Sequence, residues 1–392
     1  MKHVLCLSTL FPNAANPRFG TFVAHSLEAL AAGGNWRVSV VNPIGIPPIP
    51  LGRYRALASL PDFAEDKGLA IHRPRFTLVP RFGARLNASA IAKATLPLIQ
   101  RIHADHPIDL LDAQFFYPDG PAVCWIAEQL GLPFSVKARG ADIIFWGKKD
   151  YAHDQMLEAA YRANGLLAVS QELAGQMDKL GMPADKITIH YTGLDRDRFR
   201  PLDHVGLRGK LADSLRIQLP DDAPLLVTVG ALIERKGQEL AIGALAALPD
   251  ARLILVGKGD DELHLQRLAG DVGVGDRVHF AGSVDHNLLP VILSAADIMV
   301  LPTRSEGLAN AWVESLACGT PVVTCDVGGA RELISSETGG RLVERSVDAI
   351  AAGVRDVLAN MPSPQAVAAT VERFSWENNA AELATYYDSL TA

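Results

Sequence analysis

Residues 301–324 read LPTRSEGLANAWVESLACGTPVVT, and they describe one complete strand–helix–strand unit. An apolar strand ends at Pro302, a polar loop passes through Glu306 and Gly307, and a helix begins near Ala309 or Asn310. Gly319 is typical of a helix end, and the chain then enters the next strand. Such a unit leaves an unpaired helix N-terminus at the carboxyl end of a strand, beside a glycine that allows close approach. This arrangement predicts an anion-binding site.

The same alternation of short apolar runs and longer amphipathic stretches extends in both directions. In the half that contains this unit, the strand candidates are 224–230, 251–257, 278–282, 298–302 and 321–326. In the preceding half they are 3–9, 37–41, 110–114 and 133–139, with helices predicted over 20–34 and 120–131. The rhythm breaks at 195–222, which is polar and contains two prolines. We therefore predict an α/β protein with two doubly wound parallel sheets joined near residue 200. Ligands are expected at the carboxyl ends of the strands, in a cleft between the sheets.

The composition agrees with two globular domains and excludes several classes of protein. With 392 residues, 48% of them hydrophobic and 21% charged, the chain is neither disordered nor fibrous. A net charge of −7 argues against a nucleic acid partner. No apolar run approaches the length of a membrane span, and the start MKHVLCLSTLFP is interpreted as a buried strand rather than a signal peptide. We therefore expect a cytoplasmic protein. The cysteines lack metal-ligand spacing and predict buried, reduced thiols: Cys6, Cys124, Cys318 and Cys325.

Two pairs of charged residues follow predicted strands: Arg235 with Lys236, and Glu306 with Glu314. Gly230 ends one strand, and Arg235 and Lys236 follow it; two adjacent cations there suit a diphosphate, although they also fit a solvated basic pair. Glu314 lies in the predicted helix, where a carboxylate can accept hydrogen bonds from two ribose hydroxyls. The plainer alternative is that Glu306 only complements the helix dipole and that Glu314 is a surface residue.

Other common motifs are missing or weak. The sequence contains no G-x-S-x-G, H-E-x-x-H or G-x-x-x-x-G-K-[ST] pattern, and GKGDDE at Gly257 lacks the third glycine of a dinucleotide fingerprint. A D-x-D triplet occurs at Asp195 and Asp197, but such triplets are common by chance. We therefore expect no metal site and no nicotinamide or flavin cofactor.

Several of these segments, in this order, resemble the family-4 retaining glycosyltransferases. Glu306 and Glu314 match the E-x7-E signature, within a segment similar to E-G-x-P-N-x-x-x-E-A-x-A-x-G-x-P-V-V. The stretch GALIERKG (230–237) resembles G-R-L-x-x-x-K-G, and HYTGLDRDRF (190–199) resembles P-N-G-V-D-x-x-x-F. Residues 10–30 are similar to the family's N-terminal loop and first helix, and 374–387 to the last helix, which crosses back onto the first domain.

The resemblance implies a GT-B fold with two Rossmann-like domains. The N-terminal, acceptor-binding domain would comprise 1–198 plus 376–392, and the nucleotide-sugar donor-binding domain 199–375. It also implies transfer of a sugar with retention of anomeric configuration and without a catalytic metal. Arg235 and Lys236 would hold the donor diphosphate, Glu314 the ribose and Glu306 the sugar hydroxyls. The remaining donor contacts implied are Gly20, Gly230, Gly307, Leu308, Ala309 and Asn310.

The sequence departs from the family pattern at two places. KARGAD (137–142) stands where the family usually has T-x-H-G-x-D, so Arg139 occupies the histidine position. An arginine cannot act as a base, but it can hold a phosphate or an anionic sugar. Ala309 replaces a common proline and Trp312 lies inside the helix, which could reshape the sugar pocket.

A basic stretch lies in the half that the resemblance assigns to the acceptor. Residues 73–101 carry six basic and no acidic residues, and the proline-rich stretch 43–50 is predicted to be an extended loop. Arg81, Arg85 and Lys93 are the candidate contacts to a polyanionic or lipid-linked acceptor, or to the anionic inner face of the membrane; an ordinary solvated helix face is the alternative. The sequence thus predicts a transferase that uses a UDP- or GDP-sugar in cell-surface polysaccharide or glycolipid assembly. A nucleotide-sugar 2-epimerase and a non-catalytic nucleotide-sugar-binding subunit stay open as alternatives.

Overall fold

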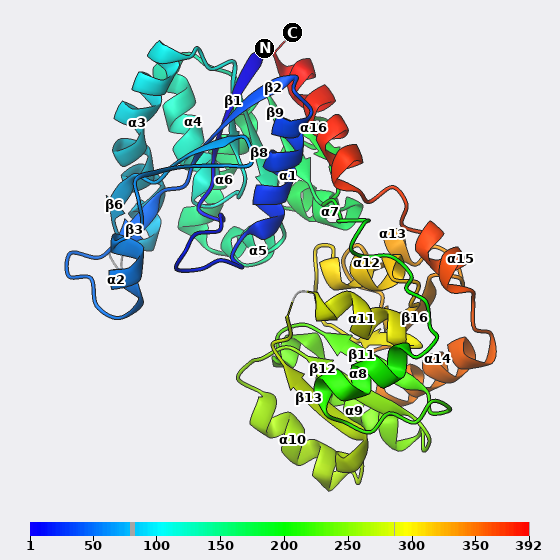
Figure 1. Cartoon of the computed structure of the whole chain (residues 1–392). Helices are drawn as coiled ribbons and strands as arrows, with labels where there is room; N and C mark the ends of the chain where they lie inside the picture. The colour runs from blue at the N-terminus through cyan, green and yellow to red at the C-terminus, as the bar shows by residue number, and fades with distance from the viewer. Residues whose placement is uncertain (79–82, 286, 392) are drawn as a thin grey trace. The chain divides into compact units, whose positions relative to one another are not determined.

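The chain divides into two compact units, and the computed structural model describes residues 1–78, 83–285 and 287–391 of it. Unit 1 comprises Met1–Gly193 and Trp376–Ala392, and unit 2 comprises Leu194–Ser375. The boundary after Gly193 therefore lies just before the stretch 195–222, where the rhythm of strands and helices breaks in the sequence. Each unit is built on its own sheet, wholly parallel in unit 2 and parallel except for β4 (Phe63–Asp66) in unit 1, which confirms the predicted α/β class (Figure 1).

Unit 1 contains an eight-stranded sheet of order β10-β9-β8-β7-β1-β2-β5-β4. The pairs are parallel except that β4 runs antiparallel to β5. Its strands are β1 (Lys2–Leu7), β2 (Trp36–Val41), β4 (Phe63–Asp66), β5 (Leu69–His72), β7 (Leu110–Ala113), β8 (Phe134–Ala138), β9 (Gly165–Ala168) and β10 (Ile187–Ile189). A separate pair is formed by β3 (Ile44–Ile46) and β6 (Arg75–Thr77).

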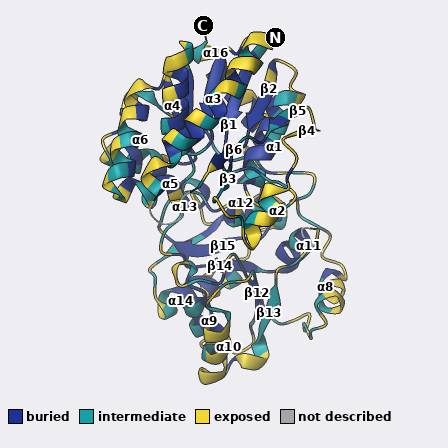
Figure 2. Cartoon of the chain, turned by 90° about the vertical axis from the view of Figure 1, so that its left-hand side faces the viewer, coloured by how far each residue is buried: buried dark blue, intermediate teal, exposed yellow. Residues whose placement is uncertain are grey.

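Helices cover both faces of this sheet. The helices of unit 1 are α1 (Thr21–Ala32), α2 (Arg53–Ala58), α3 (Asn87–Asp105), α4 (Asp119–Leu130), α5 (Ala141–Ile144), α6 (Asp150–Arg162), α7 (Gln171–Lys179) and α16 (Trp376–Leu390), with 3-10 turns η1 (Ala84–Leu86), η2 (Trp146–Lys148) and η3 (Ala184–Lys186). Side chains alternate along β1: Leu5 and Leu7 join the core under α3, α4 and α6, whereas Val4 and Cys6 join the core under α1 and α16. Burial on both faces explains why the central strands β1, β7 and β9 are mostly apolar (Figure 2).

Unit 2 contains a six-stranded parallel sheet of order β13-β12-β11-β14-β15-β16. Its strands are β11 (Leu225–Val229), β12 (Arg252–Val256), β13 (Val278–Gly282), β14 (Ile298–Leu301), β15 (Val322–Cys325) and β16 (Gly340–Val343). Its helices are α8 (Leu207–Leu215), α9 (Gln238–Ala246), α10 (Glu262–Asp271), α11 (Leu288–Ala295), α12 (Asn310–Ala317), α13 (Ala330–Leu333), α14 (Val347–Ala359) and α15 (Pro364–Ala369), with turns η4 (Glu234–Lys236) and η5 (Gly275–Arg277).

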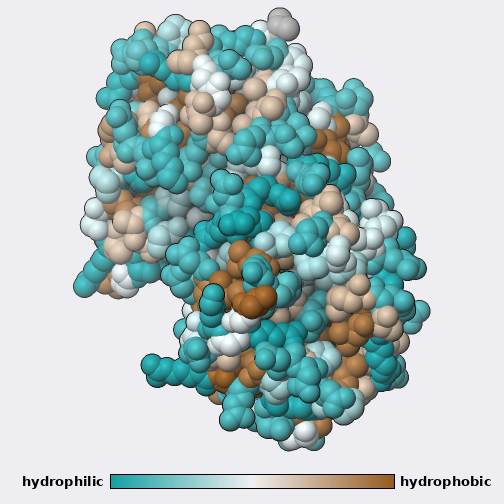
Figure 3. Space-filling view, turned by 45° about the vertical axis from the view of Figure 1, so that its right-hand side comes forward, coloured by the Kyte–Doolittle hydropathy of each residue, from teal (hydrophilic) through white to brown (hydrophobic). Residues whose placement is uncertain are grey.

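The structure corrects the sequence interpretation in two segments. The stretch 43–50, expected to be a loop, contains the short strand β3, because β6 supplies a pairing partner from about thirty residues further along the chain. The polar stretch 195–222 contains helix α8, which buries only Leu207 and Leu211 and therefore carries a weak apolar pattern. On the face shown in Figure 3, hydrophilic side chains predominate, with smaller hydrophobic groups between them.

Candidate functional site

The candidate site in unit 2 is formed by the loops that follow β11 and β14. These strands are neighbours in the sheet, so the loops after their carboxyl ends lie side by side. The backbone amide of Arg304 donates to the carbonyl of Arg235 at 2.8 Å, which joins the two loops directly. Gly237 allows this approach, because it has a φ of +74° and a Cβ there would lie 2.3 Å from the carbonyl oxygen of Pro302.

Arg235, Lys236 and Glu306 come together in this pair of loops. Glu306 Oε1 accepts from Arg235 Nη1 at 3.0 Å and from Lys236 Nζ at 2.5 Å. Glu306 and Lys236 are largely buried, with 12% and 14% of their side chains exposed, whereas Arg235 is 43% exposed. Two cations thus face one carboxylate, and the cluster retains a net positive charge at the carboxyl end of the sheet. An anionic ligand with two or more charges is the complement of such a cluster.

Thr303 is the residue of this cluster that the sequence analysis missed. Its side chain is fully buried, and its hydroxyl lies 3.2 Å from Glu306 Oε1 and 3.1 Å from the carbonyl oxygen of Arg235. The hydroxyl therefore bridges the two loops at the carboxylate itself. The signal in the sequence was its position three residues before Glu306, in the segment that was already singled out.

Helix α12 begins at Asn310, one of the two starting residues that the sequence indicated. Ala309 precedes it with an extended backbone and no side-chain cap, so the first amides of the helix keep their hydrogen-bonding capacity. The turn at Gly307 packs against residues 328 and 329. The Gly307 carbonyl accepts a hydrogen bond from the amide of Gly329 at 2.7 Å, and a Cβ on Gly328 would clash with the Glu306 carbonyl oxygen. Gly307, Leu308, Ala309 and Asn310 thus form the uncapped entry to α12.

Glu314 lies further along the same helix in a different environment from Glu306. Burial raises the pKa of this carboxyl to about 7, and the charge of Arg198 opposes that rise. A carboxyl group whose pKa lies near 7 in the free protein can ionise when a ligand supplies hydroxyl groups that donate hydrogen bonds to it. Glu314 is therefore not an ordinary surface carboxylate.

Gly230 and Gly257 show why glycines follow β11 and β12. Gly230 has a φ of +153°, and a Cβ on Gly257 would lie 1.9 Å from the Gly230 carbonyl oxygen. The backbones of the two loops therefore touch: a Cβ at Gly257 would clash, and a larger residue at Gly230 would be strained by its positive φ. This close approach keeps the loop that carries Arg235 and Lys236 against the sheet.

Gly20 and Arg139 lie in unit 1. Gly20 precedes α1 with a φ of +72°, and a Cβ there would lie 2.5 Å from the Leu10 backbone, so packing alone already requires a glycine. Arg139 follows β8, and its guanidinium donates to the side-chain oxygen of Gln114 and, through Nε, to the Gln114 carbonyl at 3.2 Å. Burial lowers the pKa of Arg139 to about 10, while Asp112 and Asp142 oppose the shift, so the guanidinium remains charged at neutral pH.

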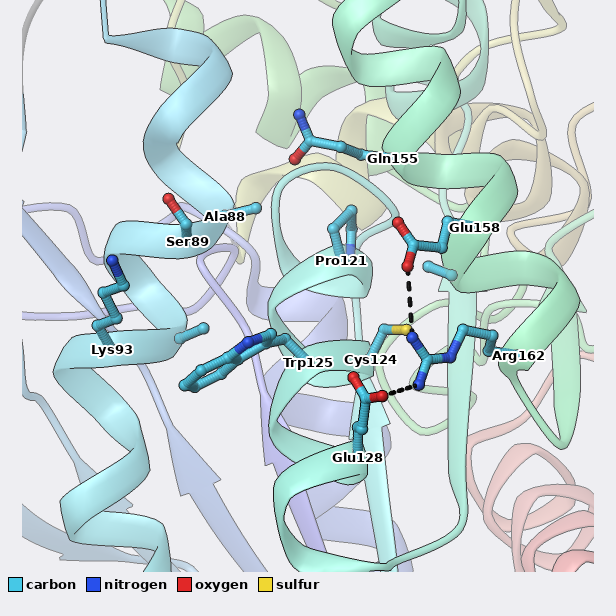
Figure 4. Close-up of a pocket in the computed structure, with 12 residues that line it drawn as sticks. Ala88, Ser89, Lys93, Pro121, Cys124, Trp125, Glu128, Gln155, Glu158 and Arg162 are labelled. Carbon is cyan, nitrogen blue, oxygen red and sulfur yellow. Dashed lines mark hydrogen bonds and ion pairs between the residues drawn. The ribbon is translucent and has the colours of Figure 1, made fainter.

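The three basic residues predicted on the acceptor side have different outcomes. Arg81 lies outside the described residues. Arg85 is exposed in η1, and Lys93 is exposed on α3, where it lines a pocket shared with α4 and α6 (Figure 4). Within the described ranges, no helix is both long and apolar enough to cross a bilayer, and no group of three His, Cys, Asp or Glu residues is placed to hold a metal ion.

Two family models match the chain, one in each unit. The model described as Glycosyltransferase Family 4 matches residues 20–198, and the model described as Glycosyl transferases group 1 matches residues 212–374. A putative teichuronic acid biosynthesis glycosyltransferase from Bacillus subtilis is 26% identical over 90% of this chain and 88% of its own length. A GDP-mannose-dependent mannosyltransferase acting on phosphatidylinositol monomannoside, from Mycobacterium tuberculosis, is 32% identical over 52% of this chain; the match spans only 56% of that enzyme.

Solved structures share the fold over the whole chain. Sucrose-phosphate synthase from Thermosynechococcus elongatus superposes with a TM-score of 0.78 at 22% identity, covering 100% of this chain and 99% of that one. HepE from Anabaena, solved with UDP-glucose, gives a TM-score of 0.74 at 19% identity and covers 100% of both chains. With a glycosyltransferase model matched in each unit and this shared architecture, the chain belongs to the family-4 glycosyltransferases and has the GT-B fold.

Proposed function

We propose that this protein transfers a sugar from a UDP- or GDP-sugar to a carbohydrate or lipid-linked acceptor, with retention of configuration and without a metal cofactor. Unit 2 binds the donor in this proposal, and unit 1 binds the acceptor. The observation that carries it is the cluster of Arg235, Lys236 and Glu306 beside the uncapped start of α12. Fixed cations and free backbone amides at the carboxyl ends of neighbouring strands are suited to a nucleoside diphosphate.

The chemistry follows from where charge grows during transfer. The bond between the anomeric carbon and the diphosphate oxygen breaks, the sugar becomes oxocarbenium-like and the leaving diphosphate gains negative charge. Arg235 and Lys236 are placed to stabilise that charge, and one well-placed donor of this kind contributes about 3–4 kcal/mol to the transition state. The acceptor hydroxyl then attacks from the face that the leaving group vacates and transfers its proton to the departing phosphate.

The two carboxylates have separate roles in this proposal. Once the diphosphate pairs with Arg235 and Lys236, the Glu306 carboxylate is no longer held by these two cations. It can then accept hydrogen bonds from hydroxyl groups of the donor sugar. Glu314 accepts the ribose hydroxyls. Glu306 does not act as a covalent nucleophile in this proposal, because its carboxylate is assigned to the sugar hydroxyls and the acceptor hydroxyl itself attacks the anomeric carbon.

Arg139 is proposed to hold an anionic group in unit 1. Its backbone amide donates to Asp142 at 3.0 Å, and its side chain is held by Gln114, so the guanidinium has a fixed orientation. An arginine cannot remove a proton at neutral pH. This argues against the 2-epimerase alternative, which needs an acid–base group, and favours a phosphate or uronate on the substrate.

A panel of UDP-, GDP-, ADP- and TDP-sugars, assayed for nucleotide release with EDTA present, tests the proposal. We expect release from one donor, and a product with the anomeric configuration of that donor. Conversion of the donor sugar without nucleotide release would instead identify an epimerase. Donor binding without release or conversion, across a set of acceptors, would favour the non-catalytic subunit.

Attachment to an anionic membrane surface is proposed for unit 1. Besides Arg85 and Lys93, the structure exposes Ile49 and Leu51 to 73% and 60% just before Arg53 and Arg55 of α2. Apolar side chains beside cations favour the interface of an anionic bilayer. Wild type should co-sediment with phosphatidylglycerol vesicles more than with phosphatidylcholine vesicles. Equal sedimentation of wild type, I49S/L51S and R81Q/R85Q/K93Q variants would remove this proposal.

A further inference from the structure

A pocket of about 200 Å³ lies in the helical layer of unit 1 (Figure 4). Its lining residues all belong to α3, α4 and α6. None of them belongs to the loops at the strand ends, where Arg139 and the donor cluster lie. The pocket is therefore a separate feature of unit 1, and of its lining residues only Lys93 already has a proposed role, at the membrane or acceptor side.

The pocket has an apolar floor and one aromatic wall. Ala88, Ala92, Cys124 and Ala159 are buried, and their small side chains leave the hollow between the helices. Trp125 projects from α4 toward α3 and is 37% exposed, although indole rings are usually well covered in folded proteins. Burial raises the pKa of the Cys124 thiol to about 11, so this floor residue stays neutral at physiological pH.

The rim is polar, rigid in part and balanced in charge. Arg162 is held between two carboxylates, with contacts of 2.8 Å to Glu128 and 3.3 Å to Glu158. Gln155 is anchored through its amide nitrogen to the Tyr151 carbonyl at 2.8 Å, which leaves its side-chain oxygen as an acceptor. With Lys93 the rim carries two positive and two negative charges. Such a balance gives little attraction for a phosphate or another strong anion.

We infer that this pocket binds a neutral glycan segment, as a second carbohydrate site apart from the transfer site. A pyranose ring presents an apolar face of C–H groups, which fits an exposed indole, and an edge of hydroxyls, which fits planar carboxylate, guanidinium and amide groups. An apolar pocket with a few convergent polar groups is the usual form of a small-molecule site. The inference rests on the proposed function, because a growing saccharide chain is the ligand that such an enzyme would retain.

Retardation in native gels that contain a soluble neutral polysaccharide tests the inference. The probes are dextran, glycogen and galactomannan, and dextran sulfate serves as the anionic comparison. Wild type should be retarded by at least one neutral polymer, and the W125A variant should bind it about tenfold more weakly, which is the loss of one ring contact. W125F keeps an aromatic face and should retain most of the binding.

Y161A is the matched control, since Tyr161 is 61% exposed on α6 but does not line the pocket. It should bind as wild type does. The E306A variant should also keep full retardation, because the donor cluster is not part of this pocket. Thermal melting of W125A, compared with W125F and wild type, shows whether a loss of binding is local.

Three results would overturn the inference: no retardation of wild type by any neutral polymer, equal retardation of W125A and wild type, or retardation by dextran sulfate alone. The last result would instead assign an anion-binding surface that includes Lys93. Failure of the proposed transferase activity remains distinguishable, because it appears as absent nucleotide release while Trp125-dependent glycan binding persists.

Discussion

In the free protein, Glu306 pairs with the two cations that are proposed to bind the donor diphosphate, Arg235 and Lys236. One oxygen, Oε1, accepts from Arg235, Lys236 and Thr303, so a diphosphate must compete with this carboxylate for the two cations. The two ion pairs with Glu306 hold the side chains of Arg235 and Lys236 in place before the donor binds. They also avoid an uncompensated charge in a largely buried position. The orientation of Glu306 also depends on Thr303, which touches no expected donor atom.

Replacing Thr303 should therefore disturb the orientation of Glu306 without weakening the binding of the donor. T303V removes the hydroxyl at nearly constant volume, and loss of a hydrogen bond to a charged group costs about 1.5–3 kcal/mol, so we expect kcat for nucleotide release to fall about tenfold or more. T303S keeps the hydroxyl and should recover most of this rate, with little change in KM for the donor. Similar rates for T303V and T303S would show that Thr303 serves packing alone.

Glu314 makes the stability of unit 2 depend on pH. Its folded pKa is about 7 against a reference of 4.5, so between these values the native state binds a proton that the unfolded chain has released. The free energy of unfolding should fall as pH rises through this window, by about 3 kcal/mol in total, and then level off. Urea unfolding of E314Q at pH 5, 6, 7 and 8 should show a flatter profile than wild type.

The same group predicts how donor binding responds to pH. If the ribose hydroxyls need the carboxylate, nucleotide binding releases a proton below pH 7 and the affinity rises as pH increases toward 8. Calorimetry in two buffers of different ionisation enthalpy detects that proton. A pH-independent affinity with no proton release would exclude the assigned role of Glu314.

At the scale of elements, backbone contacts at glycines position the site. Gly237 joins η4 to α9 at a left-handed φ and lies against Pro302, so the loops after β11 and β14 depend on it together. Helix α12 then presents its free amides because Ala309 supplies no cap. The site is thus set more by loop backbone than by side-chain packing.

G237A should disturb the site much more than a helical glycine does. The strained φ and the contact of 2.3 Å require the loop to shift, and we expect at least a tenfold loss in nucleotide affinity together with lower stability. Gly270 in α10 is the control, since it has no neighbour within 4 Å, and G270A should raise helix stability by about 0.5–1 kcal/mol. Equal nucleotide affinity in G237A and G270A would contradict this account of the loop.

Elements marked by strong local signals were predicted well. Helix α12 begins at one of the two predicted residues, because a glycine-containing loop precedes it, and Gly319, with a φ of +86°, follows its end. Strand β3 was missed because its pairing with β6 is a tertiary contact that leaves no periodic pattern in three residues. The link between Arg139 and Gln114 was missed for the same reason, since the two residues follow different strands and are 25 positions apart.

At the scale of the whole molecule, the C-terminal helix belongs to unit 1 although it follows unit 2 in the chain. Asn379 of α16 is buried and donates to the Tyr191 carbonyl at 2.6 Å, and its side-chain oxygen accepts from Ser26 at 2.7 Å. Lys2 also pairs with Asp388 at 3.0 Å, which brings the two chain ends together (Figure 1). The sequence indicated this return only through resemblance, because a helix pattern does not reveal its packing partner.

Removing residues 376–392 should therefore destabilise unit 1 and leave unit 2 nearly unchanged. We expect two calorimetric transitions in wild type, of which only one shifts upward with UDP or GDP, because only the donor unit binds nucleotide. Truncation, and N379L as the point variant, should lower the other transition. T385A, an exposed change on the same helix, should leave both transitions in place. A parallel loss in both transitions after truncation would show that the units do not unfold separately.

Nucleotide release by wild type, K236M and E306A in the presence of EDTA tests the central claim most directly. The claim is that the cluster at the carboxyl ends of β11 and β14 binds the donor diphosphate and stabilises its departure. The account predicts release from one nucleotide sugar by wild type without a divalent cation, and a loss of about 10²–10³-fold in both variants at a temperature where both remain folded. Release that requires added Mg²⁺ or Mn²⁺, or that persists in both variants, would contradict it.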